Sequence, residues 1–195
     1  MKIRWIGAHR DNFASPRTSA IDRIVIHYTA GNGDTAQNNG QYFAKADRGA
    51  SAHYFVDAKE IVQTVKEGDR AFHAGDRAMN DRSIGIEMCS RRDAKGMYYI
   101  PNATVTLTVQ LVKELMKKYG IPISGVIRHF DVNGKVCPEP FVRNPNDWAD
   151  FRAKLQPTPR EIVQNKAGLA DSTMEYLERY KYGAELIQKL AKAMQ

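Results

Sequence analysis

The pattern of apolar and polar residues predicts short strands separated by helices. Residues 21–28 (IDRIVIHY) form an apolar run rich in β-branched residues that ends in the loop TAGNGD, which is typical of a buried strand. Residues 51–65 predict two strands joined by a turn at 57–59, and residues 83–89 (SIGIEMC) and 124–128 predict two more strands. Polar stretches at 1–20 and 66–82 predict irregular connections.

Helical spacing is clearest over residues 104–119, where apolar residues recur one turn apart and Gly120 provides a stop. Asp34 is expected to cap a helix that extends to about residue 46, and Asn146 or Asp147 to start one that extends to about residue 155. After a linker at 156–159, Thr158 and Glu161 predict a capping box, and two more short helices follow from about residues 171 and 184. We therefore expect a main domain over 1–156 and a small helical C-terminal segment over 157–195.

Composition places the chain among globular proteins and limits its partners. It has 195 residues, 43% of them hydrophobic and 26% charged, with a net charge of +7. The basic balance favours an anionic partner, but the sequence contains no run of five or more Lys and Arg, so nucleic acid is not expected. The N-terminus lacks the apolar core of a secretory signal and no stretch approaches 18 apolar residues, which predicts synthesis in the cytoplasm and no membrane insertion.

Two histidines and one cysteine suggest a metal site. His27 and His129 lie at the ends of predicted strands, and Cys137 follows His129 by eight residues. Two imidazoles and a thiolate suit Zn2+, and three protein ligands leave a fourth position for water, as in catalytic zinc sites. Each residue also has a plainer interpretation, as a core histidine, a surface histidine and a buried thiol.

The two cysteines admit one further interpretation, a disulfide between Cys89 and Cys137. In a cytoplasmic chain thiols stay reduced, and a cysteine near histidines is more often a ligand or a nucleophile. We therefore favour Cys137 as a metal ligand and Cys89 as a small buried hydrophobic residue.

Hydrolysis at such a site needs a proton carrier and a stabilising cation. Strand alternation places Glu87 on the face opposite three apolar residues, so its carboxylate is expected to face a polar cavity or a positive charge, where it could act as a general base. A buried salt bridge is an equally plausible role for Glu87. Lys135, two residues before Cys137, could stabilise an oxyanion, although an ordinary solvated lysine is the simpler interpretation.

Two other histidines could contribute to the same site. Either His53 or His73 could be a fourth ligand, which would make the metal site structural. For His73 we favour a role in substrate binding, because its glycine-rich loop can border a cleft. His53 lies in a strand pattern, where a satisfied core histidine is the alternative.

Five phrases of this sequence resemble zinc-dependent N-acetylmuramoyl-L-alanine amidases of the type 2 class, which are related to phage endolysins and peptidoglycan recognition proteins. The phrases occur in the order of that family and cover roughly residues 20–155: IVIHYTAG, SAHYFVD, AFHAG, NDRSIGIEM and RHFDVNGKVCP. The resemblance implies an α/β fold with a mixed central β-sheet flanked by helices. It implies cleavage of the amide bond between N-acetylmuramic acid and L-alanine in bacterial peptidoglycan.

The resemblance also implies roles for single residues. It places Zn2+ on His27, His129 and Cys137, with Glu87 as the catalytic carboxylate and Lys135 as the cation that stabilises the transition state. We place His53, His73 and Asn80 with the substrate-binding residues, His53 through a supporting polar contact. Cysteine as third ligand points to the phage and bacterial-lysin branch, so we expect an endolysin that is made in the cytoplasm and acts on the cell wall after its release.

Two other functions compete with an enzyme. One is a non-catalytic module that binds wall fragments, which is disfavoured because the chain keeps Cys137, Glu87 and Lys135. The other is a basic nucleic-acid-binding protein with structural zinc, which predicts affinity that falls steeply with salt. For residues 157–195, wall binding, packing on the catalytic domain and formation of a homo-oligomer through the helices all stay open.

Overall fold

A computed structural model describes residues 2–194. The chain forms two compact units, Met1–Ala153 and Lys154–Gln195. This division lies within three residues of the boundary expected from the sequence at residue 156. None of the helices formed by residues 2–194 could span a lipid bilayer.

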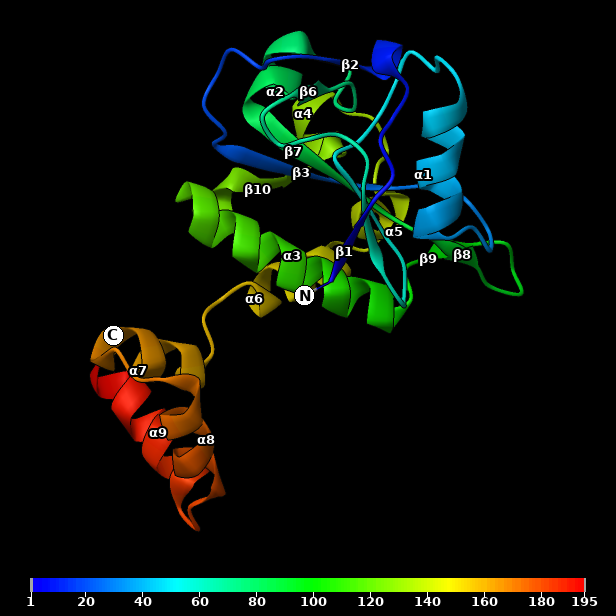
Figure 1. Cartoon of the computed structure of the whole chain (residues 1–195). Coiled ribbons are helices and arrows are strands. Elements are labelled where there is room, and N and C mark those ends of the chain that lie inside the picture. Colours follow the sequence, from blue (N-terminus) through cyan, green and yellow to red (C-terminus); the bar gives the residue numbers. More distant parts are fainter. Residues whose placement is uncertain (1, 195) are drawn as a thin grey trace. The chain divides into compact units, whose positions relative to one another are not determined.

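The first unit is built around a six-stranded mixed sheet (Figure 1). The strand order is β1-β5-β4-β7-β3-β10. Only the β4–β5 hairpin is antiparallel, and the other neighbouring strands are parallel. The six strands are β1 (Ile3–Trp5), β3 (Arg23–Tyr28), β4 (Tyr54–Val56), β5 (Ile61–Gln63), β7 (Ser83–Met88) and β10 (Val126–Arg128). The expected mixed α/β fold and the hairpin at 57–59 are confirmed.

The two faces of the sheet differ in chemistry because side chains alternate along each strand. Ile84 of β7 pairs with Ile24 of β3, and this face is apolar and fully buried. The opposite face carries Glu87 beside its partner His27, so the alternation of β7 places both polar side chains on one side. The register therefore brings two of the predicted site residues together.

Helices cover both faces of the sheet in the first unit (Figure 1). Helix α1 (Ala36–Lys45) packs on the face of Phe55 and Val62, and a Cβ atom added to Gly40 would lie only 2.9 Å from the Val62 side chain. Helix α3 (Asn102–Tyr119) contacts β4 and β7, and it ends at Gly120 in the left-handed conformation that glycine adopts without strain. The close approach of α1 to the sheet therefore requires a glycine at position 40.

The structure adds elements that the sequence pattern missed. In the polar stretches these are the sheet strand β1, η1 (Arg10–Asn12), β2 (Phe13–Ala14), β6 (Arg70–Ala71) and α2 (Arg77–Arg82). Later in the first unit they are β8 (Arg91–Arg92), β9 (Tyr98–Tyr99), η2 (Ile123–Gly125), α4 (His129–Asn133) and α5 (Glu139–Arg143). Helix α6 (Pro145–Lys154) begins close to the predicted position. The cap of α1 was predicted one residue too early, because the Thr35 hydroxyl rather than Asp34 accepts a hydrogen bond from the helix, from the Asn38 N–H.

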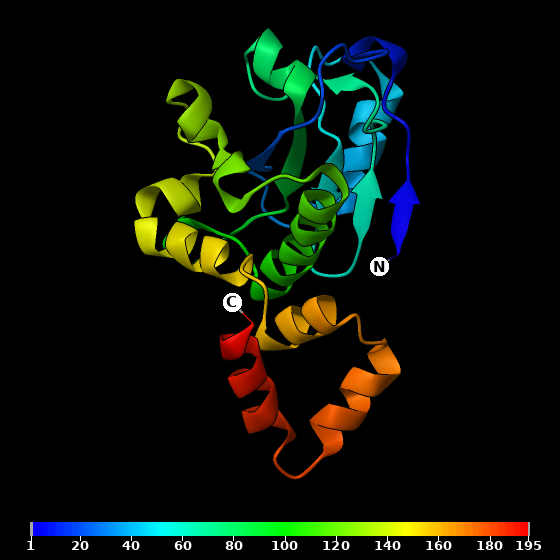
Figure 2. The ribbon, with the colours of Figure 1, turned by 90° about the vertical axis from the view of Figure 1, so that its left-hand side faces the viewer.

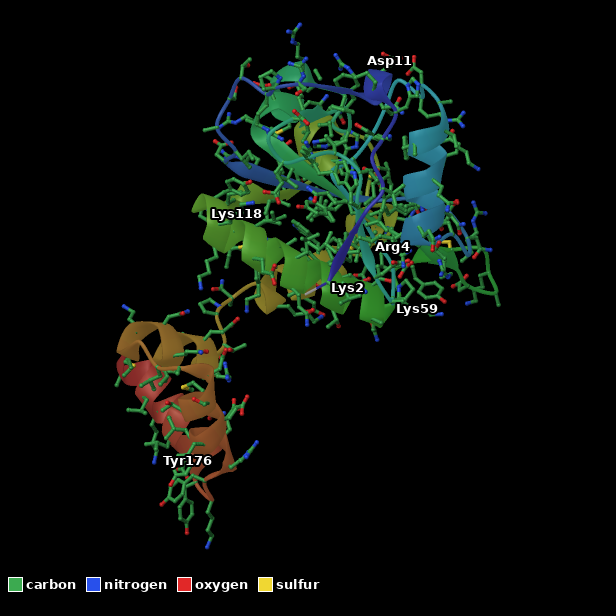
Figure 3. The ribbon with its side chains drawn as sticks, viewed as in Figure 1. Lys2, Arg4, Asp11, Lys59, Lys118 and Tyr176 are labelled. Atoms are coloured by element: carbon green, nitrogen blue, oxygen red, sulfur yellow. The ribbon has the colours of Figure 1, made fainter. Side chains whose placement is uncertain are left out.

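Three helices form the second unit, α7 (Pro159–Ala167), α8 (Asp171–Arg179) and α9 (Gly183–Ala193), coloured orange to red in Figure 2. The predicted capping box of Thr158 and Glu161 is present at the start of α7. The unit has its own apolar core, formed by Val163, Met174, Ile187 and Ala191. Tyr176 lies on its surface, 76% exposed, and is labelled in Figure 3.

Candidate metal centre

His27, His129 and Cys137 come together as the sequence predicted. His27 lies near the carboxyl end of β3, and His129 follows β10, which pairs with β3 in parallel. Parallel neighbours deliver their carboxyl ends to the same edge of the sheet, which is where open α/β sheets place their ligand sites. The possible ligand atoms of the three residues all lie within 4.8 Å of one another, and all three residues are buried. No fourth histidine belongs to this group among residues 2–194.

The hydrogen bonds show which nitrogen of His129 can bind a metal. Its Nε2 lies 3.0 Å from the carbonyl oxygen of Ala74, which can only accept, so the ring proton is on Nε2. Its Nδ1 is buried without a hydrogen-bond partner in the described part of the chain. A buried nitrogen lone pair without a partner is unfavourable in a metal-free protein and is satisfied by a metal ion.

Nδ1 of His27 also faces the candidate site, because it lies 3.7 Å from Cys137 Sγ. Tetrahedral zinc with ligand bonds of about 2.0–2.3 Å separates its ligand atoms by roughly 3.3–3.8 Å, so the spacing is compatible with a shared ion. Burial lowers the pKa of His27 well below its usual value, and burial followed by Lys135 lowers the pKa of His129. Both imidazoles are therefore neutral and ready to coordinate at neutral pH. The donor set fits a metal centre.

The thiol of Cys137 needs a cation to become a ligand. Burial, followed by the neighbouring Glu87, raises the pKa of this thiol to about 12. A coordinated divalent ion overrides such a shift, because thiols bind as thiolates. Cys89 is also buried and free, so the alternative of a Cys89–Cys137 disulfide is absent from the structure.

Glu87 and Lys135 lie on the walls of the cleft that contains the three candidate ligands. This cleft has a volume of about 410 Å³ and is bordered by β3, α1, the loop 72–75 and the segment 135–137. Burial raises the pKa of Glu87 to about 8, and the positive charge of Lys135 opposes this shift. Oε2 of Glu87 has no hydrogen-bond partner among the described residues. The alternative role of Glu87 in a buried salt bridge therefore finds no support here.

Comparison with known proteins identifies the family. The model of the N-acetylmuramoyl-L-alanine amidase family matches residues 17–140, which include all three candidate ligands. The chain belongs to this family. The match covers more than half of the chain and lies within the first unit.

Individual relatives agree with this assignment. The chain is 36% identical over 154 residues to the N-acetylmuramoyl-L-alanine amidase CwlL of Bacillus licheniformis, and 33% identical over 159 residues to BlyA of Bacillus subtilis strain 168. These alignments cover 71% and 72% of the chain. The chain spans only 42% of the length of each relative.

Solved structures show the same fold. The catalytic domain of XlyA superposes with a TM-score of 0.69 at 26% identity, covering 80% of this chain and 100% of that domain. PlyL gives a TM-score of 0.69 at 27% identity, covering 80% of this chain and 98% of its own. The predicted resemblance to endolysin-type amidases is thus confirmed at the level of family and fold.

The three residues predicted to bind substrate occupy different positions in this amidase-family chain. His73 lines the cleft, but its ring is directed at other protein groups, with Nδ1 3.0 Å from His27 Nε2. His53 is fully buried, and its Nδ1 accepts a hydrogen bond from the Gly85 N–H. Asn80 is 9% exposed, and its Oδ1 accepts hydrogen bonds from the N–H groups of His73 and Ala74. The predicted contacts of His53 and Asn80 with substrate find no support in this burial.

Sequence reasoning missed several residues that line the cleft. Tyr28, Asn39 and Tyr42 border it, and Tyr42 is 49% exposed. The backbone carbonyl of Ala74, which binds His129, was also missed, since a backbone role leaves no residue-type signal. The proximity of Tyr42 to the site could have been inferred from its place on the helix that follows the His27 strand.

Proposed function

We propose that this chain is a zinc-dependent N-acetylmuramoyl-L-alanine amidase that cleaves the amide bond between N-acetylmuramic acid and L-alanine in bacterial peptidoglycan. The single observation that carries the proposal is the buried group of His27, His129 and Cys137, open to a cleft that also contains Glu87. The relatives CwlL and BlyA are N-acetylmuramoyl-L-alanine amidases of Bacillus, which supports the choice of bond. A structural neighbour that is an endolysin from Bacillus subtilis supports action on the cell wall.

In this proposal Nδ1 of His27, Nδ1 of His129 and Sγ of Cys137 would hold Zn2+. Bound zinc supplies a Lewis acid that polarises carbonyl groups and makes water more acidic. The remaining chemistry falls to side chains of the chain itself.

Glu87 carries the proton in the proposed reaction. Its carboxylate takes a proton from the attacking water and returns it to the nitrogen of L-alanine, which then leaves as an amine. The lack of a competing hydrogen bond on Oε2 supports this role, because that oxygen is free to accept the proton. Burial favours the protonated form of the Glu87 carboxyl group, whereas the positive charge of Lys135 favours its ionised form. The two effects oppose each other, so the group can both take up and release a proton.

Lys135 neutralises the negative charge that develops on the oxygen of the scissile carbonyl. Its side chain lines the cleft beside Cys137, and its ammonium group forms no salt bridge with a carboxylate of the described residues. An ammonium ion without a fixed partner can approach a developing oxyanion at little cost.

Digestion of purified peptidoglycan by the zinc-loaded chain, followed by mass spectrometry, tests the proposal. We expect intact stem peptides with a free amino group on L-alanine, and no increase in reducing sugar ends. Metal analysis should give one zinc per chain, and removal of zinc by a chelator or the substitution Cys137→Ser should abolish release of the peptides. Full hydrolysis by the chelated protein would contradict the zinc mechanism, and new reducing ends would contradict the choice of bond.

A further inference from the structure

One loop contacts both histidines of the candidate metal centre on the side away from the metal. Residues 72–75 lie between β6 and α2, and the loop supplies a side chain to His27 and a backbone carbonyl to His129. The His73 ring is 3.0 Å from His27, and the Ala74 carbonyl oxygen is 3.0 Å from His129. A single segment thus determines the orientation of two ligands that come from different strands.

The contacts of Met79, Ser83, His73 and His27 form a series of hydrogen bonds, and the Met79 carbonyl at one end sets the direction of each bond. The carbonyl oxygen of Met79 only accepts, so the hydroxyl of Ser83, 2.6 Å away, donates to it. The Ser83 oxygen is then free to accept from the Nε2–H of His73 at 3.2 Å. A neutral His73 with its proton on Nε2 has a lone pair on Nδ1.

The contact with His73 fixes the tautomer of His27. The Nδ1 lone pair of His73 accepts a hydrogen bond from the Nε2–H of His27, so the lone pair of neutral His27 is on Nδ1. That atom is the one that faces Cys137. The contacts of Met79, Ser83 and His73 therefore select the form of His27 that can coordinate a metal.

Asn80 determines the position of the loop itself. Its Oδ1 accepts hydrogen bonds from two consecutive backbone N–H groups, those of His73 at 3.0 Å and Ala74 at 2.8 Å. Because Asn80 belongs to α2, the helix fixes both the histidine ring and the carbonyl oxygen that contact the ligands.

Gly85 provides the space that this arrangement needs. A Cβ atom added to Gly85 would lie 2.5 Å from the His73 ring, closer than a Cβ atom approaches a non-bonded neighbour. The His73 ring packs on the β7 backbone, which leaves its two nitrogens aimed at Ser83 and His27.

We propose that the loop 72–75 and α2 form an outer layer of the metal centre, in which His73 and Asn80 are positioning residues that fix the tautomer and orientation of His27 and His129. The inference rests on the zinc site of the proposed function. It assigns these two residues to the metal rather than to substrate. Partners of this kind hold a ligand in its coordinating form before the ion arrives, and their loss typically weakens metal binding by about 10–100-fold.

Zinc binding by the full-length chain tests the inference without any need for turnover. The affinity is measured by competition with a chromophoric chelator, for wild type, His73→Leu and His73→Asn. Leucine cannot accept the proton of His27, so zinc affinity should fall by about 10–100-fold. Asparagine places an amide oxygen near the position of Nδ1, so His73→Asn should recover most of the loss.

Asn80 offers a second, independent test. Asn80→Ala removes the acceptor of both backbone N–H groups and should weaken zinc binding by about tenfold, whereas Asn80→Asp keeps an acceptor and should remain close to wild type. Asn12 supplies a matched control, because it is also buried and bridges backbone groups of Phe43, Ala46 and Arg48 without contact with the candidate ligands. Asn12→Ala should lower the melting temperature and leave zinc affinity unchanged.

The absorption spectrum of the cobalt-substituted protein reports on ligand geometry directly. Loss of the His73 contact should change the ligand-field bands of bound Co2+, while Asn12→Ala should leave them unaltered.

Should His73→Leu fail to fold, Ser83→Ala removes only the hydroxyl that holds the His73 ring and should weaken zinc binding about threefold or more.

The outcomes separate this inference from the proposed function. Zinc affinity within twofold of wild type in His73→Leu and Asn80→Ala would overturn the positioning role, and a raised KM alone would return His73 to substrate binding. Tight, His73-dependent zinc binding without peptide release would leave the inference intact and contradict the proposed activity. A wild-type chain that takes up no zinc would contradict both.

Discussion

At the scale of single residues, Glu87 is subject to two opposing electrostatic effects. Its place on a largely buried strand raises the pKa of the carboxyl group to about 8, and Lys135 opposes this rise. Proton carriers work best when their pKa lies near the pH of the reaction, because both protonation states are then accessible. The position of Glu87 beside His27 in the sheet therefore suits the proton transfer that we propose for it.

Replacing the carboxylate by an amide tests that role. We expect Glu87→Gln to lower kcat by about 10²–10⁴-fold, since glutamine cannot accept the proton of the attacking water. Zinc content and binding to insoluble wall should stay at wild-type levels. Glu60→Gln is the matched control, because Glu60 is a partly exposed carboxylate paired with the exposed Arg4 and should tolerate the change. Undiminished turnover of Glu87→Gln would remove Glu87 from the proposed mechanism.

His53 makes a second residue-scale prediction, on the pH dependence of stability. Burial, followed by Arg17, lowers the pKa of His53 to about 3, so the folded chain keeps it neutral where the unfolded chain, with a pKa of about 6.5, takes up a proton. Between these values the unfolded state binds more protons, so stability falls as the pH drops below about 6.5, by up to about 1.4 kcal/mol per pH unit.

Urea unfolding of wild type and His53→Asn between pH 7 and 4.5 measures this contribution. The variant should be less stable at pH 7, because the hydrogen bond from the Gly85 N–H is perturbed. The free energy of unfolding of the variant should also depend less steeply on pH than that of wild type. The difference in slope should correspond to about one fewer proton taken up on unfolding. Parallel curves for the two proteins would show that His53 does not carry the effect.

Residue identity allowed part of the site to be predicted and left another part hidden. The types and spacing of His27, His129 and Cys137 indicated a metal centre because few chemistries combine imidazole and thiol. The orientation of His73 and Asn80 depends on hydrogen bonds with backbone groups of one loop and one short helix, such as the Ala74 N–H and the Met79 carbonyl, and on the contact of His73 with the distant His27. Sequence patterns do not encode these contacts, so the sequence alone contains no sign of a positioning role for either residue, and their role in substrate binding stays a prediction.

At the scale of elements, the segment around Arg17 joins parts of the first unit that are distant in sequence. Its guanidinium donates to the backbone carbonyls of Glu67, Asp69, Asp81 and Ser83, at 2.7–3.2 Å. It thus connects the irregular N-terminal segment to the loop before β6 and to the start of β7. Burial lowers the pKa of Arg17, yet the surrounding carboxylates Asp81, Asp69 and Glu67 oppose this shift.

We expect Arg17→Met to lower the free energy of unfolding by about 2–4 kcal/mol, because four carbonyl groups lose their charged donor while the aliphatic stem is retained. Arg4→Met is the control, since Arg4 is 54% exposed and makes a surface ion pair with Glu60. An exposed pair of this kind contributes less than about 1 kcal/mol. Chemical denaturation of both variants measures the difference, and equal losses would contradict the anchoring role of Arg17.

Elements with a strong periodic pattern were predicted well, and short polar elements were not. Helix α3 follows from helical spacing because it buries one face, and strand β7 follows from a short apolar run because nearly all of its residues are buried. Helix α2 has only six residues and no apolar stripe, and the Asp76 side chain that caps it is a signal shared with many turns. The contribution of α2 to the site is to position the loop 72–75 through Asn80, and helix propensity does not encode such a contact.

At the scale of the whole molecule, the chain consists of two units with separate cores. The family match ends at residue 140, and the second unit begins at Lys154. All the residues that we propose for chemistry lie in the first unit. The capping box at Thr158 and the periodic apolar residues predicted the helices of the second unit, but no motif in it indicates a ligand, and its role in wall binding or oligomer formation stays a prediction.

Met174 allows the two units to be separated by experiment. Its side chain is fully buried in the core of the second unit, so Met174→Ala should destabilise this unit by about 2–5 kcal/mol. Because none of the proposed catalytic residues lies there, kcat/KM on a soluble muramyl peptide should stay within twofold of wild type. A loss of activity on this small substrate would show that the first unit depends on the second for its fold.

The same variant distinguishes the two roles predicted for residues 157–195. If the second unit binds the wall, Met174→Ala should sediment less with insoluble peptidoglycan and digest whole wall more slowly, while light scattering gives the same mass for both proteins. If the second unit joins two copies, the mass should fall to that of one chain. The exposed Tyr176 permits a finer test, since Tyr176→Ala leaves the core intact and should reduce sedimentation with the wall only if this surface binds it. Unchanged sedimentation and unchanged mass in both variants would contradict both roles and favour simple packing of the helical segment.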